Sequence, residues 1–107
     1  MLYEIRIYTA APNRADPLRE RFRDHTLRLF ARHGIEVVGC WVPPEQPDQL
    51  VYMTRFPDEP ARKAAWDGFG ADAEWKRIKA ESEVNGPLLG GQSAMVLRPT
   101  DFSPTLR

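Results

Sequence analysis

The chain has 107 residues, the size of one domain, and we expect a single core in about residues 1–99 with a tail in 100–107. Fifteen Lys and Arg residues balance fifteen Asp and Glu residues, so there is no net positive field to hold nucleic acid or an anionic membrane surface. The apolar runs are too short for a membrane-spanning helix and the N-terminus lacks a secretory signal pattern, which predicts a cytoplasmic protein.

The first half of the chain predicts a strand, a helix and a second strand. Residues 2–9 alternate apolar and polar side chains, which is the period of a strand. Asp16 and Pro17 are typical of a helix start, and Gly34 fits the left-handed position that ends helices. One apolar stripe of this helix is expected to face the sheet. Its members are Leu18, Phe22, His25 and Leu29. The apolar run 35–42 predicts the second strand.

The second half repeats the order of strand, helix and strand. A proline-rich turn leads into residues 49–56, which alternate again and predict an antiparallel hairpin with the preceding strand. Asp58 is typical of a second helix start. Gly68 and Gly70 are expected to break this helix, after which Asp72 can cap a further segment.

A loop containing Gly90 and Gly91 precedes the last predicted strand, residues 93–98. The element order βαββαβ predicts a ferredoxin-like α+β domain, in which a four-stranded antiparallel sheet carries its helices on one face. In either register the other face receives apolar side chains from the last three strands. An exposed apolar face of this kind predicts a homodimer.

Several segments of the chain, in this order, resemble the NIPSNAP family. They are Tyr3 to Tyr8, Arg21 to Thr26, Leu29 to Gly34, Val38 to Trp41, Tyr52 to Phe56, Ala64 to Trp66 and Asp72 to Trp75. The resemblance spans nearly the whole chain. It implies a dimeric α+β barrel, a superfamily that also holds cofactor-independent antibiotic-biosynthesis monooxygenases, muconolactone isomerases and haem-binding relatives. No catalytic motif is carried over, so the resemblance implies a small-ligand pocket without naming a reaction.

His25 is the candidate catalytic residue, because an imidazole on the apolar stripe titrates near neutral pH and can act as an acid or a base. The alternative is a core histidine that bonds a backbone carbonyl or a tyrosine hydroxyl. Arg6 and Tyr8 share one strand face with Glu4. If that strand face points toward the helices, His25 completes a polar pocket with Arg6 and Tyr8. If it points the other way, these side chains belong to the dimer interface.

Large side chains complete the predicted ligand-binding site. Trp41, Tyr52 and Trp66 offer flat surfaces for an aromatic molecule, although aromatic residues at this spacing also build an ordinary core. Arg55 and Arg6 lie in mid-strand, where an unpaired charge is costly. We therefore expect each of them to pair with a carboxylate or to line a wet cavity.

No metal or cofactor signature accompanies these residues. The two histidines lack clustered ligands for zinc, no glycine-rich phosphate loop follows a strand, and the single Cys40 is expected to be a buried, inert thiol. Three functions stay open. The first is a homodimer that binds a small, aromatic molecule between sheet and helices. The second is a cofactor-independent monooxygenase or isomerase, in which His25 takes a proton from the substrate and Arg6 stabilises the resulting enolate. The third is a structural interaction module with a filled core.

Overall fold

The computed structural model describes residues 1–104, which contain four strands and five helical segments. In chain order they are β1 (Leu2–Ala10), α1 (Ala15–Arg21), η1 (Phe22–Thr26), α2 (Leu27–Arg32), β2 (Glu36–Trp41), β3 (Gln49–Phe56), α3 (Glu59–Ala71), α4 (Ala73–Ser82) and β4 (Leu89–Leu97). All strand pairs are antiparallel and the sheet order is β2-β3-β1-β4. The predicted ferredoxin-like α+β arrangement is therefore confirmed. The end of the predicted tail, residues 105–107, lies outside the described residues.

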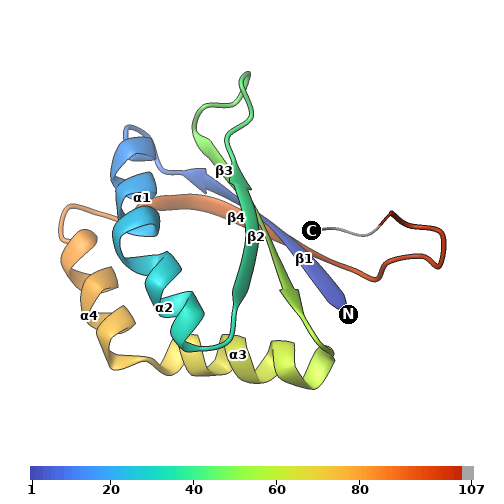
Figure 1. The fold of residues 1–107 in the computed structure, drawn as a ribbon. Coiled ribbons are helices and arrows are strands. Elements are labelled where there is room, and N and C mark those ends of the chain that lie inside the picture. The colour runs from blue at the N-terminus through green and yellow to red at the C-terminus, as the bar shows by residue number, and fades with distance from the viewer. Residues whose placement is uncertain (105–107) are drawn as a thin grey trace.

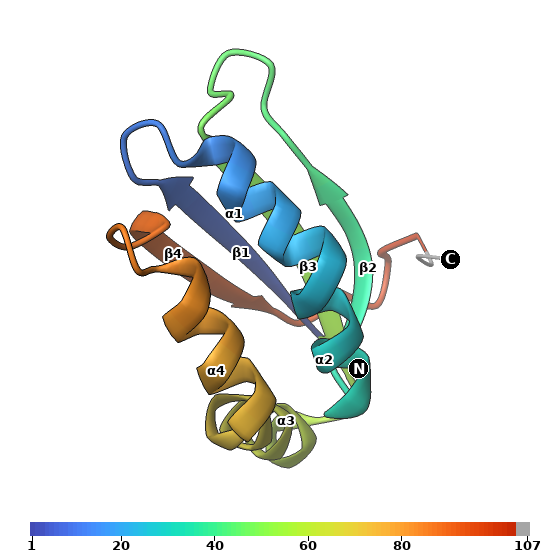
Figure 2. The same ribbon diagram turned by 90° about the vertical axis from the view of Figure 1, so that its left-hand side faces the viewer.

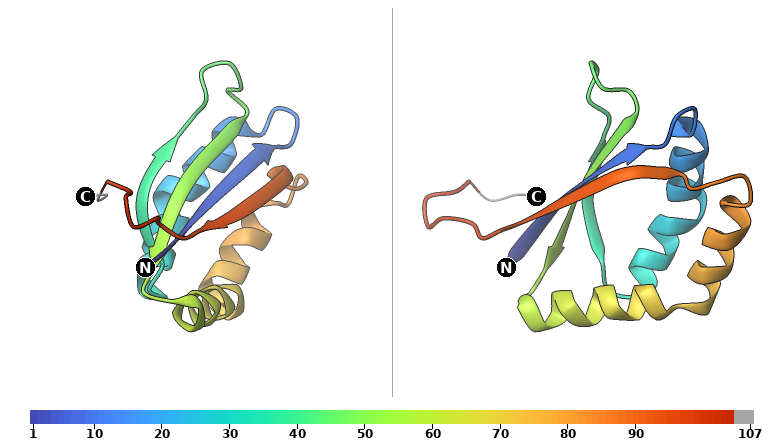
Figure 3. Two further views of the ribbon diagram at one scale, coloured as in Figure 1. Left: turned by 90° about the vertical axis from the view of Figure 1, so that its right-hand side faces the viewer. Right: turned by 180° about the vertical axis from the view of Figure 1, so that it is seen from behind.

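The helices lie on one side of the sheet (Figure 1). Seen from that side, α1 and α2 lie in front of the strands and run roughly along them, α4 lies beside them, and α3 connects the end of β3 to the start of α4 (Figure 2). Views from the opposite side and from behind show a second sheet face without a helix from the described chain, on the side where the segment after β4 extends (Figure 3). No helix within residues 1–104 is long and apolar enough to cross a membrane. The core therefore sits between the helices and one face of the sheet.

Burial alternates along β3, as its period of two predicts. The buried positions are Leu50, Tyr52, Thr54 and Phe56. In the pairing of β1 with β3, Glu4 lies opposite Thr54 and Arg6 opposite Tyr52. Directly opposed residues of paired strands point to the same face. The row of Glu4, Arg6 and Tyr8 therefore faces the helices, which decides between the two orientations that the sequence left open.

The first helical layer contains a π-helical turn, η1, between α1 and α2. The backbone N–H of Leu27 donates to the carbonyl of Phe22, five residues back, and the Thr26 hydroxyl donates to the carbonyl of Arg21 at 3.3 Å. A π turn holds one more residue than an α turn and so rotates the following side chains about the axis. Thr26 takes the buried position expected for His25, and the predicted stripe is wrong at this residue.

The helical layer of the second half breaks at Asp72 and not at the two glycines. α3 runs through both predicted break points, and a Cβ atom at Gly68 would lie 3.0 Å from His33 Nδ1, so this glycine permits a close approach. Asp72 accepts hydrogen bonds from the backbone N–H groups of Glu74 at 2.8 Å and Trp75 at 3.1 Å, which confirms the predicted cap. The His33 hydrogen bond, followed by that of Trp75, lowers the pKa of Asp72 to about 2. The cap is therefore ionised at neutral pH.

Two predictions about the edge strands are wrong. β4 begins at Leu89 and not at Ser93, so the glycine pair lies inside the strand. A Cβ atom at Gly90 would lie 3.3 Å from the Ala10 carbonyl oxygen, and glycine allows this close pairing where the register of β1 shifts. Cys40 is exposed rather than buried, because β2 is an edge strand of the sheet.

Candidate functional site

Glu4 is a carboxylate in the middle of the sheet, with only 1% of its side chain exposed. It accepts hydrogen bonds from three side chains: Arg6 Nε at 3.0 Å, Arg62 Nη1 at 3.0 Å and Trp66 Nε1 at 2.9 Å. Arg62 and Trp66 are four residues apart on α3 and therefore share one helix face. A buried charge is costly unless it is paired and hydrogen-bonded. The three donors meet this need, and Glu4 in turn fixes their side chains.

The guanidinium of Arg6 is held in two ways. Its Nε donates to Glu4, which confirms the expected carboxylate partner. Its central carbon also lies 3.8 Å from the centre of the Trp66 ring, in a cation–π contact. Within residues 1–104, neither terminal nitrogen of Arg6 has a hydrogen-bond partner. A guanidinium held in this way is pre-organised to bind an anion that presents two oxygens, such as a carboxylate.

A cavity of about 200 Å³ lies beside Arg6, between the sheet and the helices, and we call it the sheet cavity. It is lined by Arg6, Tyr8, Leu18, Arg21, Phe22, Thr26, Trp66, Phe69, Trp75, Lys79, Leu89 and Gln92. Aromatic rings provide much of the wall. Three lining side chains are cations and none is a carboxylate. The sheet cavity therefore combines flat apolar walls with a few positively charged groups, which is typical of small-molecule sites.

Two phenol groups meet at the sheet side of this cavity. The hydroxyl of Tyr52 donates to the hydroxyl of Tyr8 at 2.8 Å. Tyr52 is fully buried, and this burial, reinforced by Tyr8, raises its pKa far above the ordinary value. Tyr52 therefore stays protonated and positions Tyr8, which itself lines the sheet cavity.

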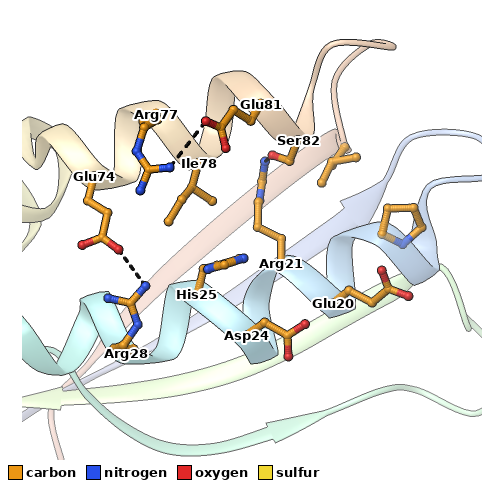
Figure 4. A pocket seen from close by; sticks show the side chains of 12 residues that line it. Glu20, Arg21, Asp24, His25, Arg28, Glu74, Arg77, Ile78, Glu81 and Ser82 are labelled. Carbon is orange, nitrogen blue, oxygen red and sulfur yellow. Dashed lines mark hydrogen bonds and ion pairs between the residues drawn. The ribbon is translucent and has the colours of Figure 1, made fainter.

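His25 lies outside the sheet cavity, in a second hollow that we call the helix groove (Figure 4). This hollow has a volume of about 460 Å³ and lies between the first helical layer and α4. Its lining is Pro17, Glu20, Arg21, Asp24, His25, Arg28, Glu74, Arg77, Ile78, Glu81, Ser82 and Leu88. The π turn directs His25 toward α4 instead of toward the sheet. The expected pocket of His25 with Arg6 and Tyr8 is therefore not assembled.

Two other predicted site residues lie away from the sheet cavity. Arg55 pairs with Glu36 at 2.6 Å on the face of the sheet opposite the helices, so its expected carboxylate partner is confirmed. Trp41 is 52% exposed and pairs in register with Val51 on that same face. Of the predicted ligand-binding residues, Arg6, Tyr8 and Trp66 line the sheet cavity, and Tyr52 supports it from beneath.

Several residues of this site were not identified from the sequence. Arg21 donates to Glu83 at 2.8 Å and to the Ser82 hydroxyl at 3.1 Å, partners that are more than 60 residues away. Gln92 reaches the cavity because β4 begins earlier than predicted and pairs it with Tyr8. Period two on a longer last strand would have indicated Gln92.

Comparisons with known proteins give one consistent result. The sequence profile of the NIPSNAP family matches residues 3–104, and no curated protein matches the chain. A NIPSNAP domain protein from Burkholderia xenovorans superposes with a TM-score of 0.83 at 23% identity, covering 98% of this chain and 100% of the other. A NIPSNAP family protein from Agrobacterium tumefaciens gives 0.83 at 22% identity, covering 96% of both chains.

An antibiotic biosynthesis monooxygenase is a more distant structural relative. It superposes with a TM-score of 0.64 at 17% identity, covering 94% of this chain and 99% of the other. At such identities the likeness carries the fold and not an activity. The profile match spans nearly the whole chain and agrees with the βαββαβ topology described above. The chain therefore belongs to the NIPSNAP family.

Proposed function

We propose that this protein is a homodimer that binds a small, flat, aromatic molecule in the sheet cavity. The observation that carries the proposal is the aromatic wall of that cavity beside the fixed guanidinium of Arg6. Pockets that bind drug-sized ligands have volumes of roughly 300–1,000 Å³, whereas the sheet cavity has a volume of about 200 Å³. The volume suits a molecule with a single ring.

The two alternative functions receive less support. An oxygenase or isomerase that uses His25 with Arg6 needs both groups around one substrate, yet they line different hollows. A purely structural module is expected to have a filled interior, and the presence of the sheet cavity argues against this function. Ligand binding without acid–base chemistry by His25 is thus the function best supported.

Replacing Trp66 by Leu is expected to weaken the binding of single-ring aromatic compounds by about tenfold or more, because it removes a flat wall of the cavity. Isothermal titration calorimetry against a small panel of such compounds measures the change. Trp41→Leu is the matched control, since Trp41 lies on the opposite sheet face, and the variants are compared at a concentration at which light scattering gives them the same mass. Absence of any binding to the wild-type protein, or equal losses in both variants, would contradict the proposal.

The second sheet face supports the homodimer. In register, Ile5 of β1 lies between Met53 of β3 and Met95 of β4, and Ile7 lies beside Val51. Met95 is 61% exposed in the single chain. An apolar patch of this kind, beside the Arg55–Glu36 ion pair on the same face, is typical of an interface, and a twofold pair of sheets would cover it in both copies.

Light scattering after size exclusion is expected to give twice the 12.3 kDa mass of one chain at micromolar concentration. Met95→Glu should raise the dissociation constant by roughly a hundredfold, because each copy would bury an unpaired carboxylate in the apolar face. Val84→Glu places the same charge at an exposed residue between α4 and β4 and should leave the mass unchanged. A wild-type protein that elutes only as a single chain would refute the dimer.

A further inference from the structure

We infer that the ligand of the sheet cavity is a small aromatic carboxylate, bound through its carboxylate by the terminal nitrogens of Arg6. This inference rests on the proposed ligand-binding function and names the chemical class of the ligand. Three independent features of the cavity carry it: the geometry of the Arg6 fork, the balance of charge around the cavity, and the neutral donors on the sheet.

The Arg6 guanidinium is held in place by its neighbours in the protein. Glu4 takes the Nε hydrogen at 3.0 Å, and the guanidinium stacks on Trp66, so the plane of the group is fixed. Both terminal nitrogens lack partners within residues 1–104. Two parallel N–H groups match the two oxygens of a carboxylate, which is the strong bidentate pairing of arginine. A ring attached to that carboxylate would lie among the aromatic walls of the cavity.

The charges around the cavity favour one negative charge on the ligand. Glu4 forms ion pairs with both Arg6 and Arg62, and Arg62 also pairs with Glu59. These two cations are therefore balanced by two carboxylates. On the other side of the cavity the cations Arg21 and Lys79 share the single carboxylate of Glu83.

One positive charge of this second group is therefore not matched by a carboxylate within residues 1–104, and none of the described residues that line the cavity is acidic. A monoanion held by Arg6 would lie in the field of this charge across the cavity. Because the Lys79 side chain is 53% exposed and partly screened by solvent, this contribution is modest, and Arg6 supplies the main attraction.

Neutral hydrogen-bond donors also line the sheet cavity and can bind the ligand together with Arg6. Tyr52 donates to the oxygen of Tyr8, so the hydrogen of Tyr8 has no acceptor within residues 1–104 and can be given to a ligand. Gln92 lies opposite Tyr8 in the pairing of β1 with β4 and lines the same cavity. These donors can meet the lone pairs of the carboxylate oxygens that the guanidinium leaves free.

Calorimetric titration with benzoate, benzamide and benzenesulfonate tests the inference. Benzamide has nearly the shape of benzoate without its charge, and benzenesulfonate keeps the charge with tetrahedral geometry. We expect benzoate to bind at least about tenfold more tightly than benzamide and no more weakly than benzenesulfonate. Arg6→Lys keeps a cation beside Glu4 but has no fork, so it should reduce the preference for benzoate to within about threefold. Arg55→Lys alters the strand arginine of the opposite face and should keep the full preference.

The outcomes separate this inference from the proposed function. Equal affinities for benzoate and benzamide, tighter binding of benzenesulfonate, or an Arg6→Lys protein that keeps the tenfold preference would each overturn the carboxylate while leaving aromatic binding intact. Failure of all three probes to bind the wild-type protein would overturn both. If Arg6→Lys does not fold, Tyr8→Phe removes one donor and should lower benzoate affinity by about threefold or more; an unchanged affinity would count against the inference.

Discussion

Replacing Glu4 by Ala is expected to lower the free energy of unfolding by about 3 kcal/mol. Removing one partner of a buried ion pair costs roughly 3–5 kcal/mol, because the remaining charge is left buried without compensation. Here Arg6 and Trp66 lose their acceptor, and Arg62 loses one of its two carboxylate partners. The lower end of that range applies, since the two arginine side chains are 21% and 22% exposed and reach some water.

Urea denaturation at one fixed protein concentration measures this effect, because the stability of an associating protein depends on concentration. Asp67→Ala is the control: among residues 1–104 this carboxylate pairs only with the exposed Lys63, and its removal should change the free energy by less than about 0.5 kcal/mol. Glu4→Gln retains an acceptor and should cost about 1–2 kcal/mol. If Glu4→Ala costs no more than the control, the carboxylate does not organise the site.

The strands were predictable because their burial follows a local rule. A period of two gave β3 its observed bounds and set Glu4, Arg6 and Tyr8 on one face. The topology followed from the element order. The sheet edges were less predictable, because Gly90 at the start of β4 is required by the close approach of the Ala10 backbone and not by its neighbours in sequence.

The candidate site was predictable only in part, because it joins distant segments. The alternation of β1 placed Arg6 and Tyr8 together, but the second and third partners of Glu4 come from α3, about 60 residues away. The π turn is the main reason for the wrong position of His25. An extra residue in one helical turn leaves the apolar pattern almost unchanged while it rotates the side chains that follow. A strict period of 3.6 residues therefore assigns the wrong face at His25, whereas Leu29, later in the same stripe, is buried as expected.

Replacing Phe30 by Ala is expected to have the largest effect on stability, about 4 kcal/mol, by the same urea measurement. Phe30 has no exposed surface. Its ring centre lies 4.8 Å from that of Phe69, 5.3 Å from Trp66 and 5.8 Å from both Phe22 and Tyr52. The substitution therefore opens a hole that rings on both the helices and the sheet must fill. A loss below about 1 kcal/mol would show that the core collapses around the hole.

Phe30 also links the stability of the core to ligand binding in the sheet cavity. Phe30 does not line the cavity, but three of its ring neighbours, Phe22, Trp66 and Phe69, do. Phe30→Leu keeps an apolar side chain and should cost only about 1 kcal/mol. Because the support behind the wall is then less rigid, we expect benzoate to bind several-fold more weakly. Phe102→Ala, at an exposed position after β4, should alter neither quantity. Unchanged benzoate affinity in a destabilised Phe30→Leu protein would mean that the cavity wall does not depend on the core behind it.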